Sequence, residues 1–292
     1  MTEPVRSPAG QLIARVNSVS DLPATLDALA VGRGRPVLVV VGGAGRMSDE
    51  DLSRAAKALA RQVVPVLDRL GAAVVDGGTD SGVMRIMGEA RSAAGAKFPL
   101  VGVAAEGTVS AYPAATRART AKIEPRHSHV ILVPGDSWGD ESPWLANVAD
   151  VVAGTGPSAT LVVNGGEITY HDIARSLERR RPVIVLAGTG RTADAIATAS
   201  DHDSKDLHAR QIASSPLTRI VSIDDGSALA GTLESILGRS PRILRASGRA
   251  DGSRRPGRRD CPLADLDSPA YAIGGDPVEH IRVQEVPERA HY

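Results

Sequence analysis

The sequence predicts a doubly wound α/β fold with a mainly parallel sheet and helices on both faces. Apolar runs of strand length recur along the chain, nearly continuous in Val, Ile and Leu, which is typical of strands buried on both faces. Most of these runs are followed at once by a glycine-rich or acidic turn, and a segment with helical periodicity usually comes next. Right-handed crossovers then bring the loops after the strands to one edge of the sheet, where ligands bind near the topological switch point.

The expected strands follow from these runs in chain order. Before the first run, residues 11–16 and 22–30 are expected to add one strand and one short helix. The strand-length runs themselves are 37–41, 72–75, 100–104, 130–133, 160–163, 183–187 and 219–223.

The clearest helix begins at Ser48, whose hydroxyl is suited to cap it and which is followed by Asp51 three residues later. Pro65 is expected to kink this helix. Its apolar stripe consists of Leu52, Ala55, Ala56, Leu59, Val63, Val66 and Leu67. Further helices are expected at 82–94, 144–152, 170–180, 192–199 and 227–237.

Composition excludes several classes of protein. The 292 residues suffice for one large domain or two small ones. Because 34 Lys and Arg balance 34 Asp and Glu, nucleic-acid binding driven by phosphate neutralisation is not expected. The single cysteine, Cys261, excludes an intramolecular disulfide framework and a thiolate metal site. The N-terminus lacks a signal-peptide pattern, and the longest uncharged stretch, 151–166, is broken by polar residues, so we expect a cytoplasmic protein without membrane insertion.

The charge pattern sets the expected domain boundaries. Residues 239–259 contain eight Arg and one Asp, whereas residues 260–292 contain seven acidic residues and two Arg. Such segregation is typical of a poorly ordered extension. We therefore expect an N-terminal tail at 1–9, a nucleotide-binding domain at 10–238 and a partly disordered extension at 239–292.

The stretch 74–88, VVDGGTDSGVMRIMG, carries the strongest local signal for chemistry. Paired glycines after a buried strand allow a sharp turn, and the free N–H groups at the start of the next helix form an anion site together with two hydroxyls. An ordinary strand-to-helix turn is the alternative, but the order of glycines, hydroxyls and helix favours phosphate binding. The residues expected to bind are Gly77, Gly78, Thr79, Ser81, Gly82, Val83 and Met84.

The run GGTDSGVM followed by GEA, then LVGVA and PRHSHVILV, resembles the N-terminal cytosolic domain of melastatin-type TRP channels, a member of the SLOG superfamily. The resemblance extends over residues 11–199 and indicates the stand-alone prokaryotic form of this domain, the LSDAT family. It implies a Rossmann-like fold and a ligand sensor that binds a nucleotide derivative such as ADP-ribose. The LOG phosphoribohydrolases, which older descriptions call lysine decarboxylase-like, are related to this family. This relationship implies that the chain forms a homodimer.

The LOG enzymes offer a test for catalysis. Their PGGxGTxxE motif, in which the Glu is catalytic, is matched by Gly165, Gly166 and Thr169, and Asp172 stands where that Glu would be. Asn164 replaces the Pro and Ile168 replaces the later Gly. The preceding helix, 144–152, has no Arg or Lys where the LOG enzymes have both.

Since loss of these cations weakens catalysis more than binding, we expect a binding or sensing protein. The alternative is a hydrolase of nucleotide N-glycosidic bonds that uses Asp172 or Glu167. A further alternative is an interaction scaffold whose pocket is vestigial.

The segment 134–145, PGDSWGDESPWL, is expected to hold the nucleoside. Its acids, Asp136, Asp140 and Glu141, are suited to accept hydrogen bonds from ribose hydroxyls, and Trp138 is suited to stack on a base. As an alternative, Asp140 or Ser142 caps the next helix while Trp144 packs into the core. No spacing among these acids dictates a metal site.

Two histidines, His127 and His129, precede a strand and share one face; hydrogen bonding at the strand edge is favoured over a role as general base. The remaining expected ligand contacts come from turns after other strands. They are Gly42, Gly43, Ser137, Gly139, Asn164, Gly165, Gly166, Thr169, Gly188 and Thr189.

Overall fold

A computed structural model of the chain describes residues 3–43, 47–110, 120–199 and 204–239. These residues belong to one compact unit, 1–243. The predicted extension lies outside the described residues except for Arg239. Among the described residues, no helix is both long enough and apolar enough to cross a membrane.

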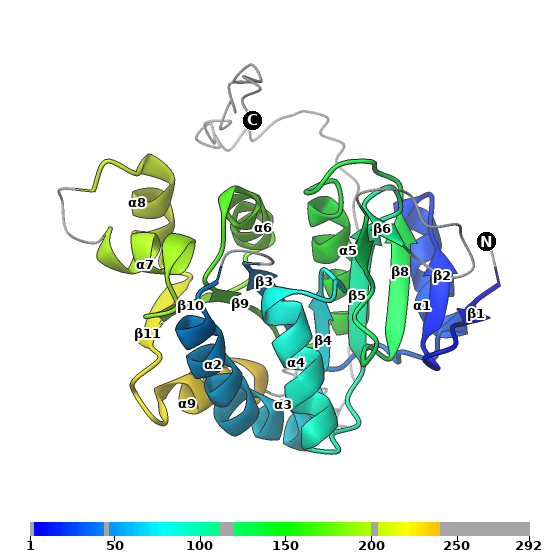
Figure 1. Cartoon of the computed structure of the whole chain (residues 1–292), viewed down its shortest axis with the longest axis horizontal. Coiled ribbons are helices and arrows are strands. Elements are labelled where there is room, and N and C mark those ends of the chain that lie inside the picture. The colour runs from blue at the N-terminus through cyan, green and yellow to red at the C-terminus, as the bar shows by residue number, and fades with distance from the viewer. Residues whose placement is uncertain (1–2, 44–46, 111–119, 200–203, 240–292) are drawn as a thin grey trace, which may run out of the picture. The chain divides into compact units, whose positions relative to one another are not determined.

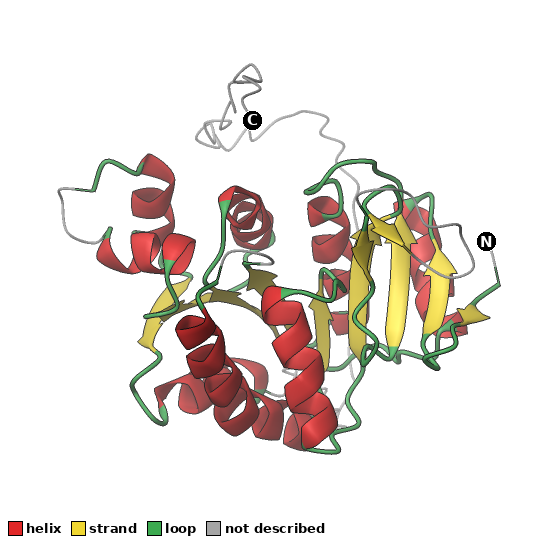
Figure 2. Ribbon diagram, viewed as in Figure 1, coloured by secondary structure: helices red, strands yellow, loops and turns green. Residues whose placement is uncertain are grey.

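The main sheet confirms the predicted α/β class (Figures 1 and 2). Its nine strands have the order β1-β2-β8-β5-β4-β3-β9-β10-β11, and every neighbouring pair is parallel except β1 and β2. The strands are β1 (Val5–Arg6), β2 (Leu12–Arg15), β3 (Val37–Gly42), β4 (Ala73–Asp76), β5 (Leu100–Ala105), β8 (His129–Val133), β9 (Ser158–Val163), β10 (Val183–Ala187) and β11 (Thr218–Ser222).

Each strand-length apolar run therefore forms a strand of this sheet. The predicted strand at 11–16 is also present, as β2. The structure adds elements too short for their pattern to be detected, namely β1, which lies in the predicted tail, and a separate parallel pair of β6 (Val109–Ser110) and β7 (Ala121–Lys122).

Helices cover both faces of the sheet because successive strand side chains point to opposite sides. Val37, Val39 and Val41 of β3 pack into one hydrophobic cluster, whereas Leu38 and Val40 pack into the other. The first cluster contains residues of α1 (Leu22–Ala28), α5 (Ser142–Ala153), α6 (Glu167–Glu178), α7 (Arg191–Thr198) and α8 (Leu207–Ala213). The second contains residues of α2 (Asp49–Ala58), α3 (Val64–Leu70), α4 (Gly82–Ala93) and α9 (Ala228–Leu237).

Local signals in the first long helical segment are confirmed. The Ser48 hydroxyl accepts a hydrogen bond from the backbone N–H of Asp51 at 3.1 Å, so Ser48 caps α2. The helix then changes to a π turn at Leu59–Val63, directly before Pro65 in the first turn of α3. This change follows from proline chemistry, because Pro65 has no N–H and its ring crowds the carbonyl four residues earlier.

The order of the strands fixes where a ligand could enter. From β3 the chain adds β4, β5 and β8 in one direction, and it then returns to place β9, β10 and β11 on the other side of β3. The switch point therefore lies between β3 and β9, which pair in parallel from Val37 with Ser158 to Gly42 with Val163.

Candidate functional site

A cleft of about 700 Å³ lies at the carboxyl edge of the sheet, at this switch point. It is bordered by the ends of β3 and β4 and by the first residues of several helices. Its described lining residues are Val40, Val41, Gly42, Gly43, Gly77, Thr79, Ser81, Met84, Ala121, Trp138, Glu141, Leu145, Gly166, Glu167, Ile168, Thr169, Asp172 and Arg191.

Glycines let the turns after β3 and β9 meet at the base of the cleft. A Cβ atom on Gly42 would lie 1.9 Å from the carbonyl oxygen of Val163, so no side chain fits there. The Asn164 backbone has φ 60°, a left-handed conformation that asparagine tolerates and proline cannot adopt. Its N–H donates to Oγ1 of Thr189 at 2.7 Å, and both residues are buried. Asn164 and Thr189 therefore join the turns after β9 and β10 beneath the cleft.

Several helices begin at the cleft. Ser81 is the N-cap of α4, Glu141 that of α5 and Gly166 that of α6, while Arg191 is the first residue of α7. No side chain caps the first N–H groups of α4, α5 or α7, in contrast to α2 and to α8, whose Asp206 caps it. Backbone carbonyl oxygens accept some of the first-turn N–H groups, since that of Val83 in α4 donates to Gly43 and that of Ala193 in α7 donates to Asn164. The other first-turn N–H groups and the positive ends of the helix dipoles favour an anion.

Arg191 adds a positive charge that sequence analysis did not assign to the site. It lines the cleft from the start of α7, and a Cβ atom on Gly166 would lie 2.9 Å from its Nη2 atom. Its backbone has φ 49°, which is uncommon for a residue other than glycine. The signal available in the sequence was an arginine directly after the turn GTG at 188–190.

Three carboxyl-bearing residues line the described part of the same cleft: Glu141, Glu167 and Asp172. Burial raises the pKa of Asp172 to about 7; the nearby Ser142 hydroxyl lowers this pKa and the charge of Glu141 raises it. The Oδ1 atom of Asp172 is buried, and among the described residues no donor is placed to hydrogen-bond to it. Burial also raises the pKa of Glu141, although the N–H of Gly139 donates to its Oε2 atom at 3.0 Å. Asp172 can therefore hold or release a proton near neutral pH.

The acids of the 134–141 loop serve partly to shape the loop itself. Oδ2 of Asp140 accepts hydrogen bonds from the N–H groups of Asp136 and Ser137, each at 3.0 Å. The alternative that Asp140 or Ser142 caps α5 is wrong, because Glu141 occupies the cap position and no side chain makes the capping bond. Proline at the second helical position of α5 removes one N–H that would otherwise need a partner.

The two tryptophans have different environments. Trp138 is 50% exposed at the rim of the cleft, and Ile168, which is 36% exposed, lines the same cleft from α6. Trp144, in α5, is only partly exposed and packs against the first hydrophobic cluster, in agreement with the prediction that it packs into the core. An indole and an apolar side chain are thus available at the mouth of the cleft.

The structure brings many of the sequence-predicted residues together. Those that line the cleft are Gly42, Gly43, Gly77, Thr79, Ser81, Met84, Trp138, Glu141, Gly166, Glu167, Thr169 and Asp172. Those outside its lining are Gly78, Gly82, Val83, Asp136, Ser137, Gly139, Asp140, Asn164, Gly165, Gly188 and Thr189. Apolar lining residues such as Leu145 and Ile168 were not predicted, because nothing local distinguishes them from core residues.

Neither histidine singled out from the sequence lines the cleft. His127 is buried and hydrogen-bonds to two carboxyl groups, and His129 at the start of β8 contacts the Ser128 hydroxyl at 2.8 Å. Within the described ranges, no group of three or more His, Cys, Asp or Glu side chains is placed to hold a metal ion.

Comparison with known proteins assigns the chain to a family. The family model described as SLOG in TRPM, prokaryote (LSDAT) matches residues 35–230. No curated protein matches the chain. Solved structures do match, among them the X-ray structure of TM1055, a structural genomics target, with 23% identity and a TM-score of 0.46 over 69% of this chain and 99% of that one.

Proposed function

Because the chain belongs to the LSDAT family of prokaryotic SLOG domains, we propose that it binds a nucleotide-derived ligand such as ADP-ribose and acts as a sensor of it. The observation that carries this proposal is the cleft at the switch point, which is lined by helix N-termini without side-chain caps, by Arg191 and by three carboxyl-bearing residues. In this proposal the two ends of the cleft recognise different parts of the ligand.

The phosphates bind beside Gly77, Thr79 and Ser81, at the start of α4, with Arg191 approaching from α7. Support comes from the backbone N–H groups and hydroxyls of this turn and from the guanidinium group of Arg191, which lines the same cleft. Asp80, the carboxyl-bearing residue of the turn, does not line the cleft and pairs with Arg85. A pyrophosphate carries two negative charges, so both α4 and α7 can contribute to binding it.

The nucleoside lies towards Trp138 and the acids. Trp138 and Ile168 offer an apolar surface for a base, and Glu141 and Asp172 can accept hydrogen bonds from ribose hydroxyls. Since Asp172 has a pKa of about 7, its protonated form can also donate a hydrogen bond.

A thermal-shift screen tests the proposal directly. The panel contains ADP-ribose, cyclic ADP-ribose, ADP, AMP and ribose 5-phosphate. A ligand present at a hundred times its dissociation constant stabilises the fold by about 2.7 kcal/mol, which is readily measured. We expect the adenine-containing pyrophosphates to stabilise most; stabilisation by none of the panel would contradict the proposal.

Hydrolysis of an N-glycosidic bond is the second candidate, and Asp172 is the observation that favours it. A carboxyl group with a pKa near 7 and an unpartnered Oδ1 atom in a cleft is suited to move a proton at neutral pH. In such a reaction water adds to the anomeric carbon, the bond to the base nitrogen breaks, and the base leaves with a proton. Arg191 supplies a cation that the helix 144–152 lacks.

Chromatography of AMP incubated with the protein distinguishes the two functions. A sensor leaves AMP intact, whereas a hydrolase releases adenine and ribose 5-phosphate. The assignment to Asp172 requires that Asp172→Asn abolish this release while ligand binding persists.

A cytoplasmic homodimer is part of the same proposal, on the basis of composition and of the resemblance to LOG enzymes. Sedimentation equilibrium checks the assembly, since a homodimer has twice the 30.3 kDa mass of one chain.

A further inference from the structure

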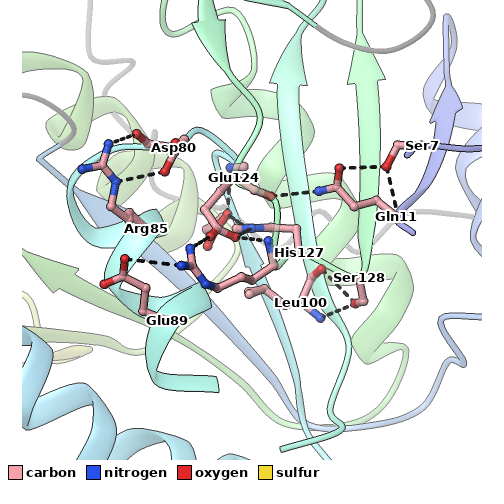
Figure 3. Close-up of polar contacts among 12 residues, drawn as sticks. Ser7, Gln11, Asp80, Arg85, Glu89, Leu100, Glu124, His127 and Ser128 are labelled. Carbon is pink, nitrogen blue, oxygen red and sulfur yellow. Dashed lines mark hydrogen bonds and ion pairs between the residues drawn. The ribbon is translucent and has the colours of Figure 1, made fainter. Parts of the chain in front are cut away.

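A buried cluster of three titratable side chains, Asp76, Glu124 and His127, lies outside the cleft lining and is hydrogen-bonded to the Gly77 turn. Figure 3 shows Glu124 and His127. His127 lies between two carboxyl groups, with Nε2 2.7 Å from Oδ1 of Asp76 and Nδ1 2.9 Å from Oε2 of Glu124. All three side chains are 0% exposed. Asp76 is the last residue of β4, so it immediately precedes Gly77 in the cleft.

Both carboxyl-bearing residues are bound to the turn. Oδ1 of Asp76 also accepts a hydrogen bond from the N–H of Gly78 at 2.7 Å. The N–H of Glu124 donates to the carbonyl oxygen of Gly78 at 2.9 Å, and the N–H of Asp80 donates to that of Lys122 at 2.8 Å. The imidazole of His127 therefore links β4, which leads into the Gly77 turn, to the segment 122–124, which is hydrogen-bonded to that turn.

Glycines allow the surrounding elements to contact the cluster without intervening side chains. A Cβ atom on Gly88 of α4 would lie 2.4 Å from Oε2 of Glu124. One on Gly102 of β5 would lie 2.6 Å from the Cα of Gly78 and 3.2 Å from Cδ2 of His127. Gly78, Gly88, Gly102 and His127 each fall in one of the four sequence runs that carry the family resemblance. These four runs thus meet at the cluster, whereas only the first of them contributes residues to the cleft lining.

The charges around His127 favour its imidazolium form. Burial by itself lowers the pKa of His127, but the charges of Asp76 and Glu124 and their hydrogen bonds raise it to about 9. With both ring nitrogens protonated, each donates to one carboxyl group; in the neutral ring, one nitrogen would face a carboxylate lone pair.

Other charged groups lie around this cluster. Arg126 pairs with Glu124 at 2.8 Å and lies 3.8 Å from Glu89 of α4, while Arg85 of α4 pairs with Asp80 at 2.9 Å. Hydrogen bonding to His127 and Arg126 lowers the pKa of Glu124 despite its burial. The charge of Glu124 also acts on Arg91 of α4.

We propose that His127 is a positioning residue which, as an imidazolium bound to Asp76 and Glu124, holds the Gly77–Ser81 turn in the geometry that binds phosphate. The ligand half of this inference rests on the proposed function, whereas the effect on the turn can be measured without a ligand. Deprotonation of His127 leaves one N–H for two carboxyl groups, so it is expected to release either Asp76 or Glu124. Both residues are hydrogen-bonded to Gly78, so either release should change the surroundings of Gly78.

Nuclear magnetic resonance of the ligand-free full-length protein between pH 6 and 10 tests the first half. The ring nitrogens of His127 and the amide of Gly78 should titrate together with a midpoint near 9. His129→Gln, two residues away on β8, serves as the control and should leave this shared titration unchanged. A Gly78 amide that does not follow His127 would overturn the inference.

The second half is tested with ADP-ribose, whose pyrophosphate does not change charge between pH 7 and 10. Its affinity should fall at least tenfold as pH rises through the midpoint of His127, and His127→Gln should lose that affinity at pH 7 and lack the pH dependence. If His127→Gln alone does not fold, the double variant His127→Gln with Glu124→Gln takes its place, because it also removes one buried negative charge. This double variant should bind ADP-ribose weakly, and its affinity should not change with pH.

The failures of the two proposals are distinguishable. If ADP-ribose binds with an unchanged pH profile in a folded His127→Gln protein, the positioning role is wrong and the proposed function stands. If ADP-ribose binds at no pH, the proposed function fails, and the ligand-free titration still decides whether His127 holds the turn.

Discussion

Asn164 packs against Gly43 so closely that a Cβ atom on residue 43 would lie 2.4 Å from the Oδ1 atom of Asn164. Asn164 cannot easily move away, because it is buried and bonded to Thr189. The turns after β3 and β9 therefore share one contact at the switch point, and the shape of the cleft depends on it.

Gly43→Ala tests this contact. We expect it to lower the free energy of unfolding by about 1–3 kcal/mol, the usual cost of adding a methylene group to a packed site. Denaturant titration measures the change, with Gly77→Ala as control because a Cβ atom there meets nothing within 4 Å. Addition of Asn164→Gly should restore stability, since glycine accepts the positive φ; equal stability of the two alanine variants would refute the contact.

Gly77→Asp tests the phosphate end of the cleft. It places a carboxylate where the anion should bind, and the open space around Gly77 leaves the fold intact. Gly82 is less suitable for this test, because its backbone φ of 49° lies in the left-handed region, where a residue other than glycine is strained. Calorimetry should detect no ADP-ribose binding, whereas Gly231→Asp, an exposed position of α9 with equal space, should bind normally. Normal binding by a folded Gly77→Asp protein would exclude this turn from the site.

Arg191→Gln removes the cation that the structure adds to the cleft. A hydrogen bond to a charged group contributes about 1.5–3 kcal/mol, so affinity for ADP-ribose should fall by about one to two decades. Arg191→Lys should retain part of the affinity because it keeps the charge. Arg175→Gln, on the exposed surface of α6, is the matched control and should bind as the wild type does.

Trp138→Ala tests the nucleoside end. Base–aromatic stacking contributes about 1–3 kcal/mol, so ADP-ribose should bind about one to two decades more weakly. Ribose 5-phosphate, which has no base, should bind with nearly unchanged affinity. Equal losses for the two ligands would mean that the indole supports the loop instead of contacting the base.

Asp172→Asn should change the pH dependence of stability. The folded state raises the pKa of Asp172 from 3.8 to about 7, so the wild type loses stability as pH rises between these values. The variant lacks this loss and should melt at a higher temperature than the wild type at pH 8, with the difference disappearing near pH 4. Scanning calorimetry measures both, and Glu3→Gln, at an exposed site, should show no such trend.

Elements whose signals are local can be predicted from the amino-acid sequence alone. Continuous apolar runs such as Val37–Gly42 specify buried strands, and Ser48 specifies a helix start, because each signal depends on neighbours along the chain. The Gly77 turn was predicted for the same reason. The short strands β1, β6 and β7 contain too few residues for a periodic pattern to appear.

Which of these turns meet depends on the tertiary structure. Asp172 and Arg191 line the same cleft as Gly77 because β9 returns beside β3 and β10 pairs with β9. The pairing of β3 with β9 joins residues more than a hundred positions apart, and no local pattern encodes it. The protonation of His127 likewise depends on Asp76, 51 residues away. Its pKa is set by burial and by charges that the fold brings within hydrogen-bonding distance, and these are absent from any window of sequence.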